Sequence, residues 1–169
     1  MKIGLVLREL HRSENDLAHE LLKASEHNKV DQEMYHLARD LAGWSQRHIP
    51  LIAGAAHRYG EDLNSEPETE LKMLERVRES TSDLIGRRSD ASLLMLRDLR
   101  LIYTKASGVS TDWEMLAQAA QAAQAAQAAQ GIKHTGLLAV TKKCHPDTLR
   151  QMRWANTKLK ESSTQVLLS

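Results

Sequence analysis

The chain has 169 residues, a formal net charge of +1 and 41% hydrophobic residues, which indicates one soluble globular domain over residues 1–169. So small a net charge gives no overall attraction to nucleic acid or to acidic membranes, and no run approaches the roughly 20 apolar residues of a membrane span. The single cysteine, Cys144, excludes an intramolecular disulfide and agrees with a reducing compartment. Because the N-terminal stretch lacks the apolar core of a signal peptide, we expect a cytoplasmic protein.

Helical periodicity dominates the chain, since Phe is absent, period-two alternation is missing, and Gly and Pro fall mostly between segments of period 3.6. This pattern predicts an all-α fold, an antiparallel up-down bundle of four long helices plus a C-terminal helix. We expect the first helix over residues 2–27 and the second over 31–59, and the short turn between them makes this pair antiparallel. Pro50 lies inside the second helix and predicts a kink near His48.

Capping signals mark the third and fourth helices. Residues 65–68, Ser-Glu-Pro-Glu, combine a Ser cap, an early Pro and a Glu three residues after the cap, so the third helix is expected to begin there and to run to about residue 106. Gly108 is expected to end it. Residues 111–114, Thr-Asp-Trp-Glu, repeat the capping pattern and open the fourth helix.

The fourth helix contains a low-complexity segment, residues 117–130, which is essentially Ala-Ala-Gln repeated. Ala is the best helix former and Gln is tolerated, so the segment is predicted to be helical rather than disordered. A period of three does not follow the 3.6-residue turn, so no face is continuously apolar. We therefore expect this part of the helix to project beyond the bundle or to pack loosely.

His145 and Pro146 predict the start of the C-terminal helix, over residues 146–168. Steps of three and four residues form a short heptad seam along it: Leu149, Met152, Asn156, Leu159, Ser163 and Val166. The seam can pack on the bundle or dock a partner helix, so a homo-oligomer or a protein partner bound through this helix is expected. Trp154 lies opposite, among basic residues that are expected to form a solvated face, with an acidic partner or a nucleic-acid backbone as the disfavoured alternative.

Two ionisable residues interrupt the apolar stripes of the first two helices. Glu14 falls among Ile3, Leu10, Leu17 and Leu21, and His48 falls on the second stripe, which comprises Val30, Leu37, Leu41, Trp44, Leu51 and Ala55. A buried carboxylate or imidazole costs free energy unless it is paired. Because the two positions lie within one helical turn of each other in an antiparallel pair, Glu14 and His48 are expected to meet.

A metal site is the alternative interpretation of these residues. His134 is predicted to face inward at a similar depth, with His11 on the flank of the pair. Carboxylate and imidazole ligands of this kind suit Fe, Mn or Zn. The competing interpretation is a buried Glu–His hydrogen bond, with His134 as an ordinary core residue, whereas His19, His27 and His57 are expected to face solvent.

Glu33-Met-Tyr-His36 has the Glu-x-x-His spacing of ferritin-like di-iron proteins, and with Glu14 upstream it resembles half of such a site. The His57 to Glu61 spacing is similar to that of hemerythrin-like bundles. The resemblance covers the first two predicted helices, and a second Glu-x-x-His does not follow. It implies a four-helix bundle that carries one or two metal ions.

Two functions follow from these patterns. The chain is expected to be a non-enzymatic helical-bundle protein that acts through self-association or partner binding, because neither a Gly-rich phosphate loop nor a supported nucleophile is present. The alternative is a metal-binding bundle of ferritin-like or hemerythrin-like type with an internal Glu/His site.

Overall fold

A computed structural model describes residues 2–81, 91–130 and 136–169. These residues form five α-helices and no strand, which confirms the all-α class: α1 (Lys2–His27), α2 (Gln32–His57), α3 (Glu70–Thr81), α4 (Ala91–Ala129) and α5 (Gly136–Leu168). Among these helices we find none with the length and apolarity needed to span a bilayer.

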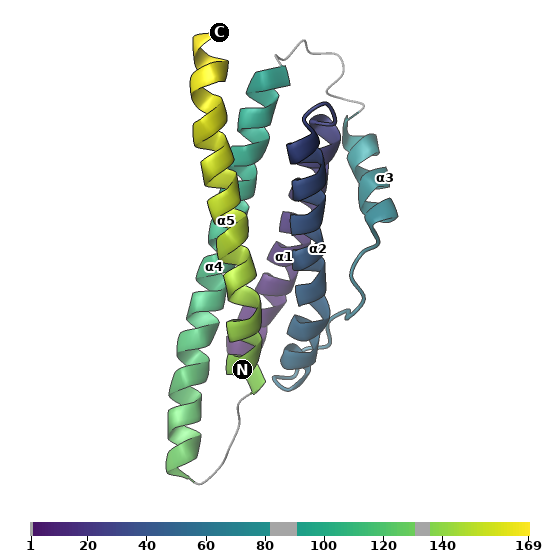
Figure 1. Ribbon diagram of the computed structural model, residues 1–169. Coiled ribbons are helices and arrows are strands. Elements are labelled where there is room, and N and C mark those ends of the chain that lie inside the picture. The colour runs from purple at the N-terminus through teal and green to yellow at the C-terminus, as the bar shows by residue number, and fades with distance from the viewer. Residues whose placement is uncertain (1, 82–90, 131–135) are drawn as a thin grey trace.

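The helices associate as two antiparallel pairs, α1 with α2 and α4 with α5 (Figure 1). The pairs meet where α1 packs on α4 and α2 packs on α5, and α3 lies against α1 on the outside. Asp31 caps α2 by accepting the backbone N–H of Met34 at 3.0 Å, which fixes the tight turn after α1. Because α3 runs back along the bundle, α2 and α4 point in the same direction (Figure 1).

The third helix is much shorter than predicted. Its first residue is Glu70 because Thr69, and not Ser65, acts as the cap: Thr69 Oγ1 accepts the backbone N–H of Lys72 at 3.4 Å. The remainder of the predicted third helix falls partly on residues 82–90, which lie outside the described residues, and partly on the first half of α4.

Gly108 does not end a helix, contrary to the prediction, because α4 continues through it. The hydroxyl of Thr111 donates to the carbonyl oxygen of Ser107 at 3.0 Å, so it bonds back within the helix and does not cap a new one. Val109 and Trp113 are fully buried on the opposite face. A mid-helix glycine costs only about 1 kcal/mol, which the burial of two such side chains outweighs.

The C-terminal helix also begins earlier than predicted. α5 begins at Gly136 and continues through Pro146, where the helix was expected to start. Pro146 is exposed, and the loss of one backbone hydrogen bond there falls on the solvent side. Helical spacing of the buried face is maintained on both sides of the proline, at Thr141, Cys144, Thr148, Gln151 and Ala155. Packing of this face on the bundle therefore keeps the residues before and after Pro146 in one helix.

The buried face of α2 is rotated from the predicted stripe. Leu37 is 38% exposed, and Val30, which lies in the turn before α2, is 97% exposed, although both were expected to face the core. The buried positions are instead rich in small residues, which include Ala38, Ala42 and Ser45. Small side chains let α1 approach closely, and leucines of α1 such as Leu10 and Leu17 are fully buried.

Candidate functional site

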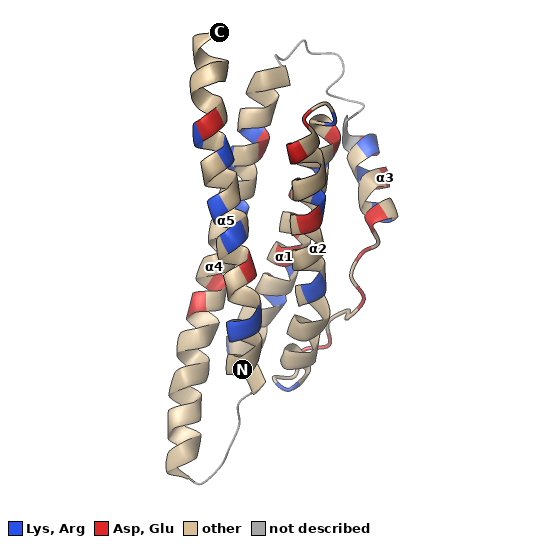
Figure 2. Cartoon of the chain, in the orientation of Figure 1, with Lys and Arg blue, Asp and Glu red and all other residues tan. Residues whose placement is uncertain are grey.

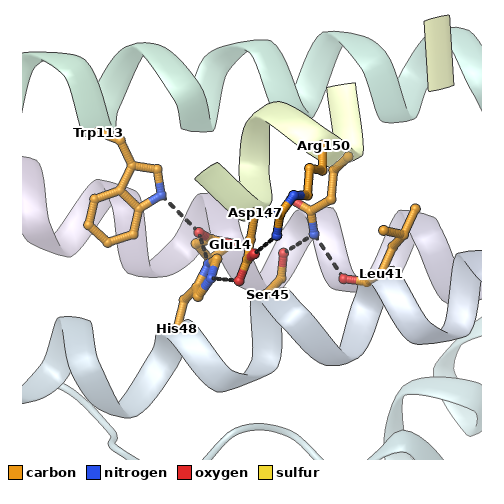
Figure 3. Close-up of polar contacts among 8 residues, drawn as sticks. Glu14, Leu41, Ser45, His48, Trp113, Asp147 and Arg150 are labelled. Carbon is orange, nitrogen blue, oxygen red and sulfur yellow. Dashed lines mark hydrogen bonds and ion pairs between the residues drawn. The ribbon is translucent and has the colours of Figure 1, made fainter. Parts of the chain in front are cut away.

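Glu14 and His48 form a buried pair at the centre of the bundle, as predicted. Glu14 Oε1 accepts a hydrogen bond from His48 Nδ1 at 2.7 Å, and it also accepts the indole N–H of Trp113 at 3.1 Å (Figure 3). The ring of Trp113 stands edge-on to that of His48, with centroids 6.0 Å apart and an interplanar angle of 89°. One carboxylate oxygen thus joins α1 to both α2 and α4.

Asp147 of α5 extends this arrangement to the fourth long helix. His48 Nε2 lies 3.4 Å from Asp147 Oδ2, and Asp147 Oδ1 accepts from Arg150 Nη1 at 3.2 Å (Figure 3). We refer to Glu14, His48, Trp113 and Asp147 as the Glu14 cluster. Both ring nitrogens of His48 therefore face carboxylates of the protein itself.

The electrostatics of the cluster favour a charged imidazole and a neutral thiol. Burial opposes protonation of His48, but its bonds to Glu14 and Asp147 outweigh burial and raise its pKa. Burial, together with the charges of Glu14 and Asp147, raises the pKa of the neighbouring Cys144 thiol to about 12. An imidazolium between two carboxylates is not a free base, and a protonated thiol is a poor nucleophile.

Two further polar groups extend the cluster along α2 and α5. The side-chain amide of Gln151 donates to the carbonyl oxygen of Leu41 at 2.8 Å and contacts Ser45 Oγ at 3.0 Å. Within the described chain, Gln151 Oε1 and Glu14 Oε2 are buried without a hydrogen-bond partner. Unpaired buried polar atoms are costly. The hydrogen bonds that pair the other polar atoms join α1, α2, α4 and α5, so they require these four helices to stay in register.

The other residues predicted as ligands do not join the cluster. His11 Nε2 contacts the carbonyl oxygen of Asn64 at 2.8 Å, outside the core. Glu33 accepts from Lys158 Nζ at 2.7 Å on the surface, and His36 is exposed next to Tyr35. His134 lies outside the described residues.

The described residues do not fit the ferritin-like ligand pattern at this depth. Ser45 stands three residues before His48, where Glu-x-x-His requires a carboxylate. No group of three or more His, Cys, Asp or Glu side chains in the described ranges is arranged to hold a metal ion. The site of Glu14, His48 and His134 stays a prediction, because His134 is not described.

Some functional-looking residues had no clear signal in the sequence. Trp113 has an indole ring that suits an ordinary core position, and Asp147 directly follows His145 and Pro146, which predicted a helix start. His27 was expected to face solvent, which is wrong: its Nδ1 lies 2.8 Å from Asp98 Oδ2, and the two side chains are only 6% and 4% exposed. His57 is exposed, as predicted.

A surface groove opens at the edge of the Glu14 cluster, between α2, α5 and the segment before α3. It encloses about 600 Å³. We call it the His48 groove and define it by Arg47, His48, Leu51, Pro67, Lys143 and Asp147. The groove borders the buried cluster at His48 and Asp147, and its volume is in the range of small-ligand sites.

The Glu14 cluster and the His48 groove lie side by side, because His48 and Asp147 belong to both. No protein-family model, curated protein or solved structure gives a significant match to this chain.

Proposed function

We propose that the protein is a non-enzymatic helical-bundle protein that acts by self-association, and that residues 121–129 of α4 form the contact between copies. We call these residues the α4 extension. In this proposal α1, α2, α4 and α5 form one antiparallel bundle, α3 lies outside it, and the extension projects from one end.

The observation that carries the proposal is the uneven length of the helices. α4 has 39 residues, whereas α1 and α2 have 26 each. At 1.5 Å per residue these are about 58 Å and 39 Å long. The end of α4 accordingly extends past the ends of α1 and α2 (Figure 1). Most of the extension is exposed, at Gln121, Ala122, Ala125, Ala126, Ala128 and Ala129.

The absence of charge in the extension supports a contact rather than a solvated helix. The sequence has no Asp, Glu, Lys or Arg from Met115 to Gln130, and the end of α4 is free of red and blue in Figure 2, unlike the exposed faces of α1, α2 and α5. Exposed helices normally carry charged side chains, many of them in i,i+4 pairs.

Helix energetics point in the same direction. The extension continues the packed part of α4, so it needs no nucleation of its own, but its exposed face lacks the tertiary packing that gives protein helices most of their stability. Ala side chains allow two helices to approach closely, and Gln side chains can hydrogen-bond at the edge of such a contact. Two copies of the extension related by a two-fold axis would present the same surface to each other, the commonest geometry of a homodimer.

Partner binding through the C-terminal helix is the weaker form of the proposal. Leu149 of the predicted seam is 39% exposed. Met152 and Leu159, however, are partly buried and pack against the core. Part of the seam is therefore already engaged within the chain, whereas most of the extension is exposed.

The test is the mass of the protein in solution with and without like charges in the extension. Ala122→Glu combined with Ala126→Glu places two carboxylates one turn apart on an exposed face, where they repel each other and their copies in a dimer. Thr104→Glu combined with Thr111→Glu is the matched control, because both threonines are exposed on the same helix within the bundle.

Sedimentation velocity should give the wild type and the control the mass of two or more 19.0 kDa chains. The Ala122→Glu, Ala126→Glu variant should sediment as a 19.0 kDa monomer with unchanged helicity by circular dichroism. A monomeric wild type, or a variant that keeps the wild-type mass, would contradict the proposal.

A further inference from the structure

We propose that the His48 groove is a binding site for a small amphipathic carboxylate, with the anionic group held by Arg47 and Lys143 and the apolar body lying on Leu51 and Pro67. The groove is formed within one chain, so this inference goes beyond self-association and does not depend on it.

The shape of the groove suits a ligand with an apolar body. Its volume of about 600 Å³ falls within the range of small-molecule sites. Pro50 and Leu51 of α2 and Pro67 from the segment before α3 contribute rigid or branched apolar walls. Gly43 also lines the groove and adds no side chain to it. A Cβ atom at this position would lie 3.6 Å from Arg47 Nη1.

The charges at the groove favour an anion. Arg47 and Lys143 are both exposed, and neither has an ion pair or hydrogen bond with any described residue. Some other cations of the described chain are, in contrast, already paired, as Arg39 is with Glu26 and Glu70. Two unpaired cations supplied by different helices, next to an apolar wall, are complementary to a carboxylate with a hydrocarbon or aromatic body.

Asp147 also lines the groove, so the groove has one carboxylate beside its two cations, Arg47 and Lys143. Its carboxylate is engaged by His48 at 3.4 Å and by Arg150 at 3.2 Å, so its charge is partly neutralised. The contact with His48 Nε2 is much longer than the 2.7 Å contact between His48 Nδ1 and Glu14. A ligand carboxylate would still be repelled by Asp147, which gives the test a variant with the opposite sign.

Octanoate is the probe, and isothermal titration calorimetry on the full chain is the measurement. A ten-heavy-atom ligand of ordinary efficiency should bind with a dissociation constant of about 1 mM or tighter. Lys143→Ala and Arg47→Ala should each weaken binding by about two- to fivefold, the range for exposed charge pairs. Asp147→Asn should tighten it by a similar factor. Lys142→Ala is the matched control, because Lys142 is also exposed but lines a different depression.

Octan-1-ol separates charge recognition from simple apolar adsorption. The proposal requires octanol to bind more weakly than octanoate and to be insensitive to Lys143→Ala. Equal binding of the two probes would overturn it, as would a Lys142→Ala effect equal to that of Lys143→Ala. No saturable heat with octanoate at millimolar concentrations would also overturn it. All the substituted cations are exposed, so loss of folding does not confuse the result.

Discussion

Removing His48 should destabilise the protein more than removing Glu14, although the two residues share one hydrogen bond. His48→Leu leaves the Glu14 carboxylate fully buried, with only the indole N–H of Trp113 at 3.1 Å as a donor. Glu14→Leu leaves an imidazole that can become neutral and still contacts Asp147. An uncompensated buried charge is the more costly outcome.

The magnitudes follow from burial. The side chain of Glu14 is 0% exposed and that of His48 is 3% exposed, so solvent offers little screening. Breaking a buried ion pair from one side costs about 3–5 kcal/mol, which we expect for His48→Leu. Glu14→Leu removes the acceptor of two hydrogen bonds, from His48 and from Trp113, and leaves neutral donors behind. At about 0.5–1.5 kcal/mol for each bond, we expect this variant to lose about 1–3 kcal/mol. The double variant replaces the pair by two apolar side chains and should be more stable than the sum of the single losses predicts.

Urea unfolding of the wild type, the two single variants and the double variant gives the coupling energy between Glu14 and His48. We expect a coupling of at least about 1 kcal/mol, well outside the roughly 0.5 kcal/mol within which independent sites add. Strict additivity would show that the Glu14–His48 contact contributes nothing. Equal slopes against urea concentration are the control that the four denatured states are comparable.

The same cycle should depend on pH in a defined direction. The pKa of His48 is raised in the folded protein above its ordinary value of 6.5. A raised pKa means that the stabilisation is fully present below the unfolded value of 6.5 and is lost as pH rises through the folded value. The coupling should therefore be larger at about pH 5.5 than at about pH 9. A coupling that grows with pH would refute the charge assignment.

Three further outcomes are expected. Gly108→Ala should stabilise the protein by about 0.5–1 kcal/mol in thermal unfolding, because a Cβ there meets no atom within 4 Å; destabilisation would mean that α4 is not continuous at this residue. Asp98→Leu should cost about 1–3 kcal/mol by leaving buried His27 without its partner, whereas Asp40→Leu on an exposed surface should change stability by less than about 0.5 kcal/mol. Cys144 should react with a thiol reagent only after unfolding, since it is fully buried with a pKa of about 12; rapid labelling of the native protein would contradict that environment.

The first two helices and their internal pair could be predicted because the anomaly was local. Glu14 and His48 are charged residues at positions where the helical period requires apolar ones, and a turn of few residues fixes which positions face each other. Trp113 gave no such signal, since an indole suits a core position. Asp147 lies beside the buried stripe of Cys144 and Gln151, and that spacing was the available clue to its location.

The helix boundaries were predicted less well because local signals compete with packing. Gly108 and Pro146 are ordinary helix terminators, yet each lies on an exposed face while buried residues continue on the other side. Residues 65–68 have the sequence pattern of a helix cap, but the helix begins after Thr69. A cap contributes about 1 kcal/mol, so tertiary contacts readily decide among several candidate starts.

The Glu14 cluster has a consequence for how freely the sequence can vary. The rest of the core is built mainly from Leu and Ala, side chains that can interdigitate at more than one offset between helices. A shift of α4 by one turn, about 5.4 Å, would carry the Trp113 indole away from Glu14 and leave the carboxylate without that donor. We expect a library that keeps Glu14, His48 and Trp113 but shuffles the aliphatic residues to yield single, well-ordered bundles. A library that keeps the aliphatic residues and shuffles these three should yield mixtures of offsets.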